Sequence, residues 1–153
     1  MNTFNEKSLK NYIDEAIDKL YKNDSHLIRC VNEEDKSKNK YHVSERSIVS
    51  RFGIYFEECR LKFFSEYDLD IEYNRDIYDC KRLAGKPVIP DLILHKRGTN
   101  ENNLLVLEFK TWWNRDQNND INKIKGLKKE YGYRYGAVIL IGKTRNDCKV
   151  NWI

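Results

Sequence analysis

The segment that decides the fold spans residues 88–110 and reads VIPDLILH (88–95), KRGTNENN (96–103) and LLVLEFK (104–110). Its first and last parts are apolar runs of strand length, separated by polar residues typical of a turn. Proline cannot donate a hydrogen bond to a sheet ladder, so Pro90 belongs at the start of its strand or on an unpaired edge. We therefore predict a β-hairpin, with the second strand, apolar on both faces, in the centre of a sheet.

Charged residues stand near the ends of this hairpin. Glu108 and Lys110 are two positions apart on one strand, so their side chains leave the same face. Asp91 begins the preceding strand, and antiparallel pairing can bring its carboxylate next to Glu108. A divalent cation relieves the repulsion of two close carboxylates, and a nearby lysine can neutralise negative charge that develops in a reaction. The alternative interpretation is a surface Glu–Lys pair with an unrelated aspartate in a turn.

The flanking sequence supplies helices and further strands. Residues 3–23 carry apolar side chains at helical spacing, and Thr3 and Glu6 have the spacing of a capping box, which predicts a first helix. Similar patterns predict a helix over 44–64, a strand over 71–77, a helix over 119–131, and strands over 136–141 and 149–153, the last at an edge. This order of elements predicts a single α/β domain over residues 1–153.

The second predicted helix contains two candidate acidic residues, Glu45 and Glu57. At 100° per residue, Glu45 lies about 20° from Phe52 on the apolar stripe, whereas Glu57 lies about 140° from it. A charge on a buried stripe needs a partner, and a metal ion or its waters would be one. Glu45 is also explained as a first-turn glutamate favoured by the helix dipole, so both readings stay open. We expect Glu57 to have no site role.

The composition disfavours membrane-spanning, secreted, disulfide-framed and zinc-knuckle proteins. No apolar run approaches the ~20 residues that a membrane-spanning helix needs. The first residues show neither the basic nor the apolar region of a secretion signal. The four cysteines are scattered without a CxxC pair, which disfavours a disulfide framework or a zinc knuckle. We expect a cytoplasmic protein with no membrane partner.

Positive charge is concentrated in one segment. The whole chain has a net charge of +4, but residues 110–134 alone carry seven Lys or Arg against three Asp or Glu. A basic segment beside an acidic site suits binding to a phosphate backbone, although a solvated helix face explains it equally. The predicted nucleic-acid contacts are Lys123, Lys125 and Lys128, with Arg46 and Arg51 on the second helix.

These motifs together resemble a known superfamily. Pro90-Asp91, followed by Glu108-Phe109-Lys110 at the end of an apolar strand, resembles the PD-(D/E)xK signature of restriction-endonuclease-like nucleases. The helix opening at residues 44–49 is similar to the glutamate-bearing first core helix of archaeal Holliday-junction resolvases and their relatives. The resemblance covers residues 42–142 and implies an αβββαβ core with a mixed central sheet flanked by helices. The helix over 3–23 would be an addition.

The resemblance also implies a chemistry. Asp91, Glu108 and the Phe109 carbonyl would ligate Mg²⁺, for which Mn²⁺ can substitute, with Glu45 as a further acidic residue acting directly or through a water. Lys110 would be the catalytic lysine. The implied activity is hydrolysis of phosphodiester bonds in DNA, more as an endonuclease than as an exonuclease, in a chain that can form homodimers. The alternatives are an RNA-directed nuclease and a catalytically inactive nucleic-acid- or protein-binding module. One departure is that the downstream helix lacks the glutamine often found there, having Asp120 and Lys123 instead.

Overall fold

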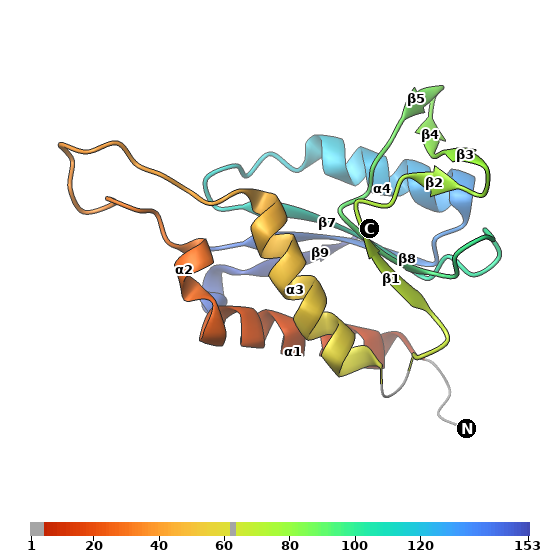
Figure 1. Cartoon of the computed structure of the whole chain (residues 1–153), viewed down its shortest axis with the longest axis horizontal. Helices are drawn as coiled ribbons and strands as arrows, with labels where there is room; N and C mark the ends of the chain where they lie inside the picture. The colour runs from red at the N-terminus through yellow and green to blue at the C-terminus, as the bar shows by residue number, and fades with distance from the viewer. Residues whose placement is uncertain (1–4, 62–63) are drawn as a thin grey trace.

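The computed structural model of the chain describes residues 5–61 and 64–153 (Figure 1). Its helices are α1 (Glu6–Asn23), α2 (Ser25–Ile28), α3 (Glu45–Arg60) and α4 (Asn118–Tyr131), with a 3₁₀ turn, η1, over Arg145–Asp147. The side chain of Asn5 caps α1 by accepting a 2.7 Å hydrogen bond from the Ser8 N–H. Thr3 and Phe63, two positions of the predicted helices, lie outside the described residues. No helix within the described ranges combines the length and apolar character needed to span a bilayer.

The centre of the fold is a five-stranded sheet in the order β1-β6-β7-β8-β9. Its strands are β1 (Asp68–Ile71), β6 (Leu92–His95), β7 (Leu105–Thr111), β8 (Tyr135–Ile141) and β9 (Lys149–Trp152). Only the β7–β8 pair is parallel. The protein is therefore a mixed α/β fold with a mostly antiparallel sheet flanked by helices, and β9 forms one edge as predicted.

The predicted hairpin is confirmed, although its first strand begins at Leu92 and not at residue 88. Strands β6 and β7 pair antiparallel, with Leu92 opposite Leu107 and Leu94 opposite Leu105. Pro90 stands two residues before β6, so its missing N–H interrupts no ladder bond. β7 lies in the middle of the sheet, and its apolar side chains are buried on both faces.

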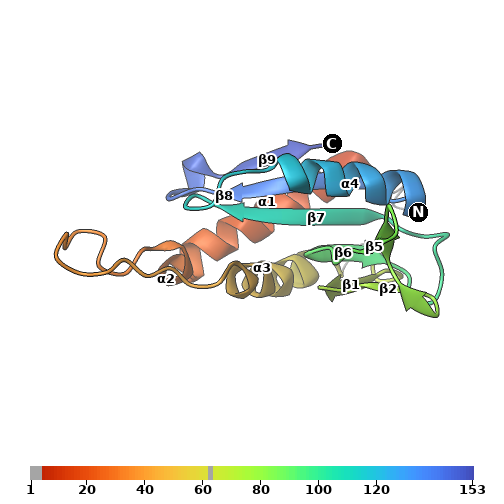
Figure 2. The same ribbon diagram turned by 90° about the horizontal axis from the view of Figure 1, so that it is seen from above.

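Helices cover both faces of the sheet (Figures 1 and 2). One face packs on α1 and α3 through a large apolar cluster that includes Ile13, Phe52, Phe56, Leu107 and Phe109. The other face packs on α4 through a smaller cluster that includes Val106, Val138, Ile124 and Leu127. Gly136 permits the close approach of α4, because a Cβ at this position would lie 2.4 Å from Cγ2 of Ile124. The face that carries Glu108 and Lys110 is therefore the α4 face.

Two predicted boundaries are wrong. The strand placed at residues 71–77 ends at Ile71, because Glu72 adopts a left-handed backbone conformation with φ of 52° and turns the chain away. Beyond it the chain forms two small antiparallel ribbons, β2 (Arg75–Asp76) with β3 (Asp79–Cys80), and β4 (Arg82–Leu83) with β5 (Lys86–Pro87).

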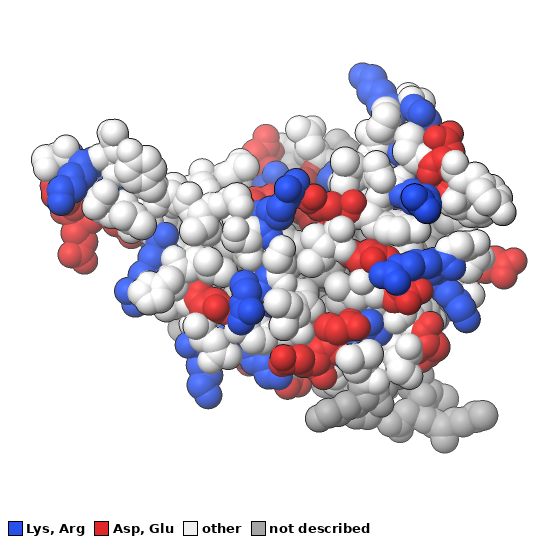
Figure 3. Space-filling model, viewed as in Figure 1, with Lys and Arg blue, Asp and Glu red and all other residues white. Residues whose placement is uncertain are grey.

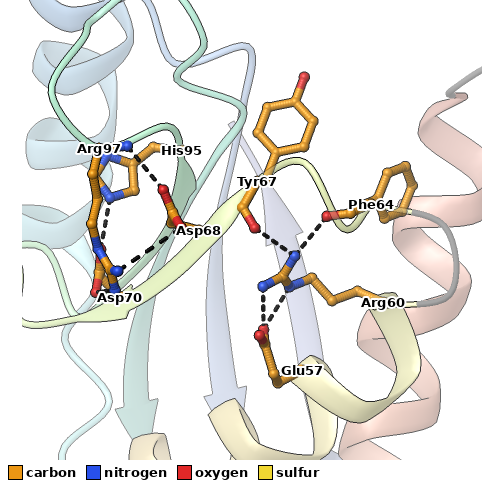
Figure 4. A network of polar contacts seen from close by, with 8 residues as sticks. All are labelled: Glu57, Arg60, Phe64, Tyr67, Asp68, Asp70, His95 and Arg97. Atoms are coloured by element: carbon orange, nitrogen blue, oxygen red, sulfur yellow. Dashed lines mark hydrogen bonds and ion pairs between the residues drawn. The ribbon is translucent and has the colours of Figure 1, made fainter.

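The second predicted helix also stops early, at Arg60. The Arg60 side chain is buried, and its Nη1 donates to the carbonyls of Phe64 at 2.6 Å and Tyr67 at 2.8 Å (Figure 4). These bonds satisfy the main-chain carbonyls of Phe64 and Tyr67, which lie between α3 and β1.

Candidate active site

The hairpin brings Asp91 and Glu108 together. The Asp91 N–H donates to Oε1 of Glu108 at 3.3 Å, and the Phe109 N–H donates to Oδ2 of Asp91 at 2.8 Å. These bonds fix the Asp91 carboxylate against the backbone of β7, next to the carboxylate that β7 itself supplies. The two carboxylates therefore lie at one place on the sheet, the arrangement that antiparallel pairing of the hairpin predicts.

Glu108 is the most deeply buried carboxylate of the site, with 1% of its surface exposed. Burial raises the pKa of Glu108 to about 8, and the negative charge of Asp91 contributes to the rise, against the opposing effect of Lys123. Burial likewise raises the pKa of Asp91. A cation bound between these two carboxylates would stabilise their charged forms.

Two lysines lie against these carboxylates, and each has an acidic partner. The Lys110 Nζ is 3.1 Å from Oδ2 of Asp120, a buried residue in the first turn of α4. The Lys123 Nζ donates to Oε2 of Glu108 at 2.7 Å and to the Ile89 carbonyl at 3.0 Å. Helix α4 therefore contributes one carboxylate and one ammonium group to a site whose other members come from the hairpin.

Glu45 enters the site from the first turn of α3. With Asp91 it lines a hollow of about 390 Å³ between the start of α3 and the end of β1. Its Oε2 is buried and has no hydrogen-bond partner among the described residues. Burial raises the pKa of Glu45 to about 7, with Lys110 opposing and Asp91 adding to the rise. A buried, unpartnered carboxylate oxygen beside Asp91 supports the reading of Glu45 as a site residue.

Glu57 has a different environment. Its Oε2 accepts a 2.6 Å hydrogen bond from Nε of the buried Arg60 (Figure 4). Twelve residues separate Glu57 from Glu45, so the two lie roughly 18 Å apart along the helix axis. The structure thus gives Glu57 a structural partner.

The two glutamates make a matched pair of substitutions. We expect Glu45→Gln, which removes a charge from the site, to weaken Mn²⁺ binding or slow cleavage by roughly tenfold or more. Glu57→Gln should leave both properties near the wild-type values, because the residue lies outside the site. Calorimetric Mn²⁺ titration and a cleavage assay on both variants provide the test. An inactive Glu57→Gln beside a fully active Glu45→Gln would show that the helix register has been misassigned.

The five residues predicted to contact nucleic acid differ in their interaction partners and in their exposure to solvent. Lys123 belongs to the carboxylate site itself. Three others have intramolecular partners: Lys128 with the main-chain oxygen of Ile153, Arg46 with Glu72, and Arg51 with Asp24. Lys125 is exposed on α4. On the face shown in Figure 3, acidic and basic side chains are interspersed, so this face presents no simple basic band.

Asp120 is the site residue that sequence reasoning missed. A signal for it existed, because at 100° per residue Asp120 lies about 40° from Ile124 and about 20° from Leu127 on the buried stripe of α4. Like Glu45, Asp120 is a charged residue on the buried stripe of a helix, where a charge needs a partner.

The raised pKa values predict how stability depends on pH. Glu45 and Glu108 have an ordinary pKa of 4.5 and titrate near 7 and 8 in the folded, metal-free protein. Between these limits the folded chain binds more protons at these groups than the unfolded chain, so their contribution to stability falls as pH rises. In EDTA, the wild type should lose more thermal stability than Glu108→Gln on going from about pH 5.5 to about pH 8.5. Parallel melting midpoints for the two proteins across this range would contradict the assignment.

The site is not pre-arranged as a closed metal centre. Within residues 5–61 and 64–153, no three His, Cys, Asp or Glu side chains are positioned as a metal-binding group. The ion pair with Lys123 engages Oε2 of Glu108. The donor set nevertheless suits a hard divalent cation, since it consists of carboxylate oxygens, and Oε2 of Glu45 has no partner in the described part of the chain.

No protein-family model, no curated protein and no solved structure matches this chain. Any functional assignment therefore rests on the residues of the site.

Proposed function

We propose that this protein is a metal-dependent nuclease that hydrolyses phosphodiester bonds, with DNA as its substrate. The observation that carries the proposal is the convergence of Asp91, Glu108 and Lys110 with Glu45 at one buried place. If the two small ribbons β2–β3 and β4–β5 are set aside as insertions, the remaining order α3-β1-β6-β7-α4-β8 supports an αβββαβ core like that of restriction-endonuclease-like nucleases, with α1 as an addition.

Asp91 and Glu108 would hold the Mg²⁺ ion, with the Phe109 carbonyl and Glu45 as further oxygen ligands, Glu45 directly or through water. When bound, such an ion lowers the pKa of a coordinated water and stabilises charge on a phosphoryl oxygen. Oε2 of Glu108 can ligate the ion only if Lys123 gives up its present ion pair with that oxygen. The hydrogen bond from the Phe109 N–H keeps Asp91 oriented toward the same point.

Lys110 supplies positive charge to the reacting phosphate. Its side chain is 17% exposed, so it reaches the surface of the site. Burial lowers the pKa of Lys110, but the carboxylate of Asp120 outweighs this effect and the net shift is upward, which keeps the amine protonated. A fixed ammonium group at this place can stabilise the negative charge that develops as the phosphodiester bond is attacked. Asp120 acts as a positioning residue because it holds the ammonium group.

A non-catalytic binding module is the second candidate. The observation that favours it is the ion pair between Lys123 and Glu108, which satisfies the buried carboxylate without a metal. In that case the charged site would be a purely internal network, and divalent ions would neither bind to it nor support turnover.

A cleavage panel separates the candidates. The purified protein is incubated with single-stranded, double-stranded and branched DNA and with RNA, in Mn²⁺ and in EDTA. We expect cleavage of DNA in Mn²⁺ or Mg²⁺, and none in EDTA, because the side chains supply no nucleophile of their own. Cleavage confined to RNA would redirect the proposal to an RNA-directed nuclease. Cleavage of no substrate in any metal, by folded protein, would favour the binding module.

A further inference from the structure

A second hollow, of about 470 Å³, lies where β7 and β8 end. Its lining includes three basic side chains, Arg115, Lys143 and Lys149, and one acidic one, Asp147. The wall formed by η1 depends on Gly142, because a Cβ there would lie 2.4 Å from Cβ of Asp147. Glycine therefore allows the turn to fold back on the end of β8, which shapes the hollow.

Two of the basic side chains are unengaged. Arg115 and Lys149 are exposed, and among the described residues neither side chain has an ion-pair or hydrogen-bond partner. Lys143 is different, because it forms an ion pair with Glu33 and lies 4.4 Å from the ring centre of Trp112. The carboxylate of Asp147 accepts a 2.7 Å hydrogen bond from Oγ1 of Thr144. The hollow therefore presents two positive charges that are available to a ligand.

Strand register places this hollow beside the candidate active site. Lys110 of β7 pairs with Leu140 of β8, and Leu140 pairs with Lys149 of β9. Paired residues project from the same face of a sheet, so Lys110 and Lys149 flank Leu140 on the α4 face. Two strand spacings separate their backbones, which is about 10 Å. A chain of phosphates that reaches Lys110 has its next negative charges within reach of Lys149.

We infer that this hollow binds a backbone phosphate next to the one that reacts at Lys110, through Arg115 and Lys149. The inference rests on the proposed nuclease function and extends its contact surface beyond the residues that sequence analysis named. Phosphate contacts of this kind fix the register of the strand without reading its sequence. The hollow would therefore position any sequence equally.

The test compares two double variants that have the same net charge. The first is Arg115→Gln with Lys149→Gln, and the control is Lys7→Gln with Lys96→Gln, two exposed lysines outside the basic segment that have no ion pair among the described residues. Binding of a short fluorescein-labelled DNA duplex is measured by anisotropy in Ca²⁺ at several salt concentrations. We expect the first variant to bind roughly tenfold more weakly and to lower the slope of log affinity against log salt by about 1–2. The control should retain the wild-type slope.

The outcomes distinguish failure of the phosphate site from failure of the proposed nuclease function. Equal slopes for both double variants, with wild-type protein that binds DNA, would overturn the phosphate site and leave the proposed function standing. A folded wild-type protein that binds neither DNA nor RNA would overturn the proposed function and the phosphate site together.

Discussion

Replacement of Lys110 by methionine should slow cleavage by about 2–4 kcal/mol of activation free energy, or roughly 30- to 1000-fold, while Mn²⁺ binding survives. Methionine retains much of the aliphatic stem and removes the ammonium group that lies 3.1 Å from Asp120. Because Lys110 is not one of the proposed metal ligands, its loss should act on turnover.

Lys7→Met is the matched control for this substitution, since it removes an exposed lysine from α1, away from the proposed site and from the predicted nucleic-acid contacts. Single-turnover rates and Mn²⁺ titration of both variants supply the measurement. An unchanged rate in Lys110→Met would exclude Lys110 from the reaction. Loss of Mn²⁺ binding in a folded Lys110→Met would show that its role is to maintain the metal site.

The Glu108→Ala variant should lose both Mn²⁺ binding and cleavage. Glu108 is the proposed ligand at the centre of the site, and its removal also leaves Lys123 without its carboxylate partner. A residual ammonium group where the cation should bind opposes metal binding further. Cleavage should fall more than about 1000-fold, a larger loss than removal of a single electrostatic contact causes.

Glu130→Ala is the control for Glu108→Ala, because it removes an exposed glutamate from the same helix that carries Lys123. Circular dichroism shows whether each variant is folded before activity is compared. A folded Glu108→Ala that still cuts at the wild-type rate would place the chemistry elsewhere in the protein.

The hairpin and its two carboxylates could be predicted because local rules determine them. Apolar runs of strand length, a polar turn and the position of Pro90 fix the β6–β7 pairing, and the two-residue period then places Glu108 and Lys110 on one face. Strands β8 and β9 also lie within one residue of their predicted bounds, because β8 is a continuous apolar run and β9 alternates polar and apolar residues.

The segment between α3 and β6 could not be predicted in the same way. β1 over Asp68–Ile71 alternates acidic and apolar residues only briefly, and the left-handed turn at Glu72 leaves no periodic signal. The two short ribbons that follow pair strands of only two residues each, which are too short for hydrophobic patterning to detect.

The contribution of α4 to the site could not be predicted from the sequence either. Lys123 was predicted to contact nucleic acid, whereas in the structure it forms an ion pair with Glu108 across 15 positions of the chain. Its placement depends on how closely α4 packs on β8, which Gly136 permits and which no local pattern specifies.

The proposed divalent-metal site can be tested by calorimetric titration of Mn²⁺ into metal-free wild-type protein. We expect saturable binding accompanied by proton release, because Glu108 has a pKa of about 8 in the metal-free protein and must lose its proton to ligate the ion. The heat measured near neutral pH should therefore vary with the ionisation enthalpy of the buffer, and Glu108→Gln should show neither binding nor this dependence. Absence of saturable binding by the folded wild type, or equal binding by Glu108→Gln, would contradict the claim that these carboxylates form a divalent-metal site.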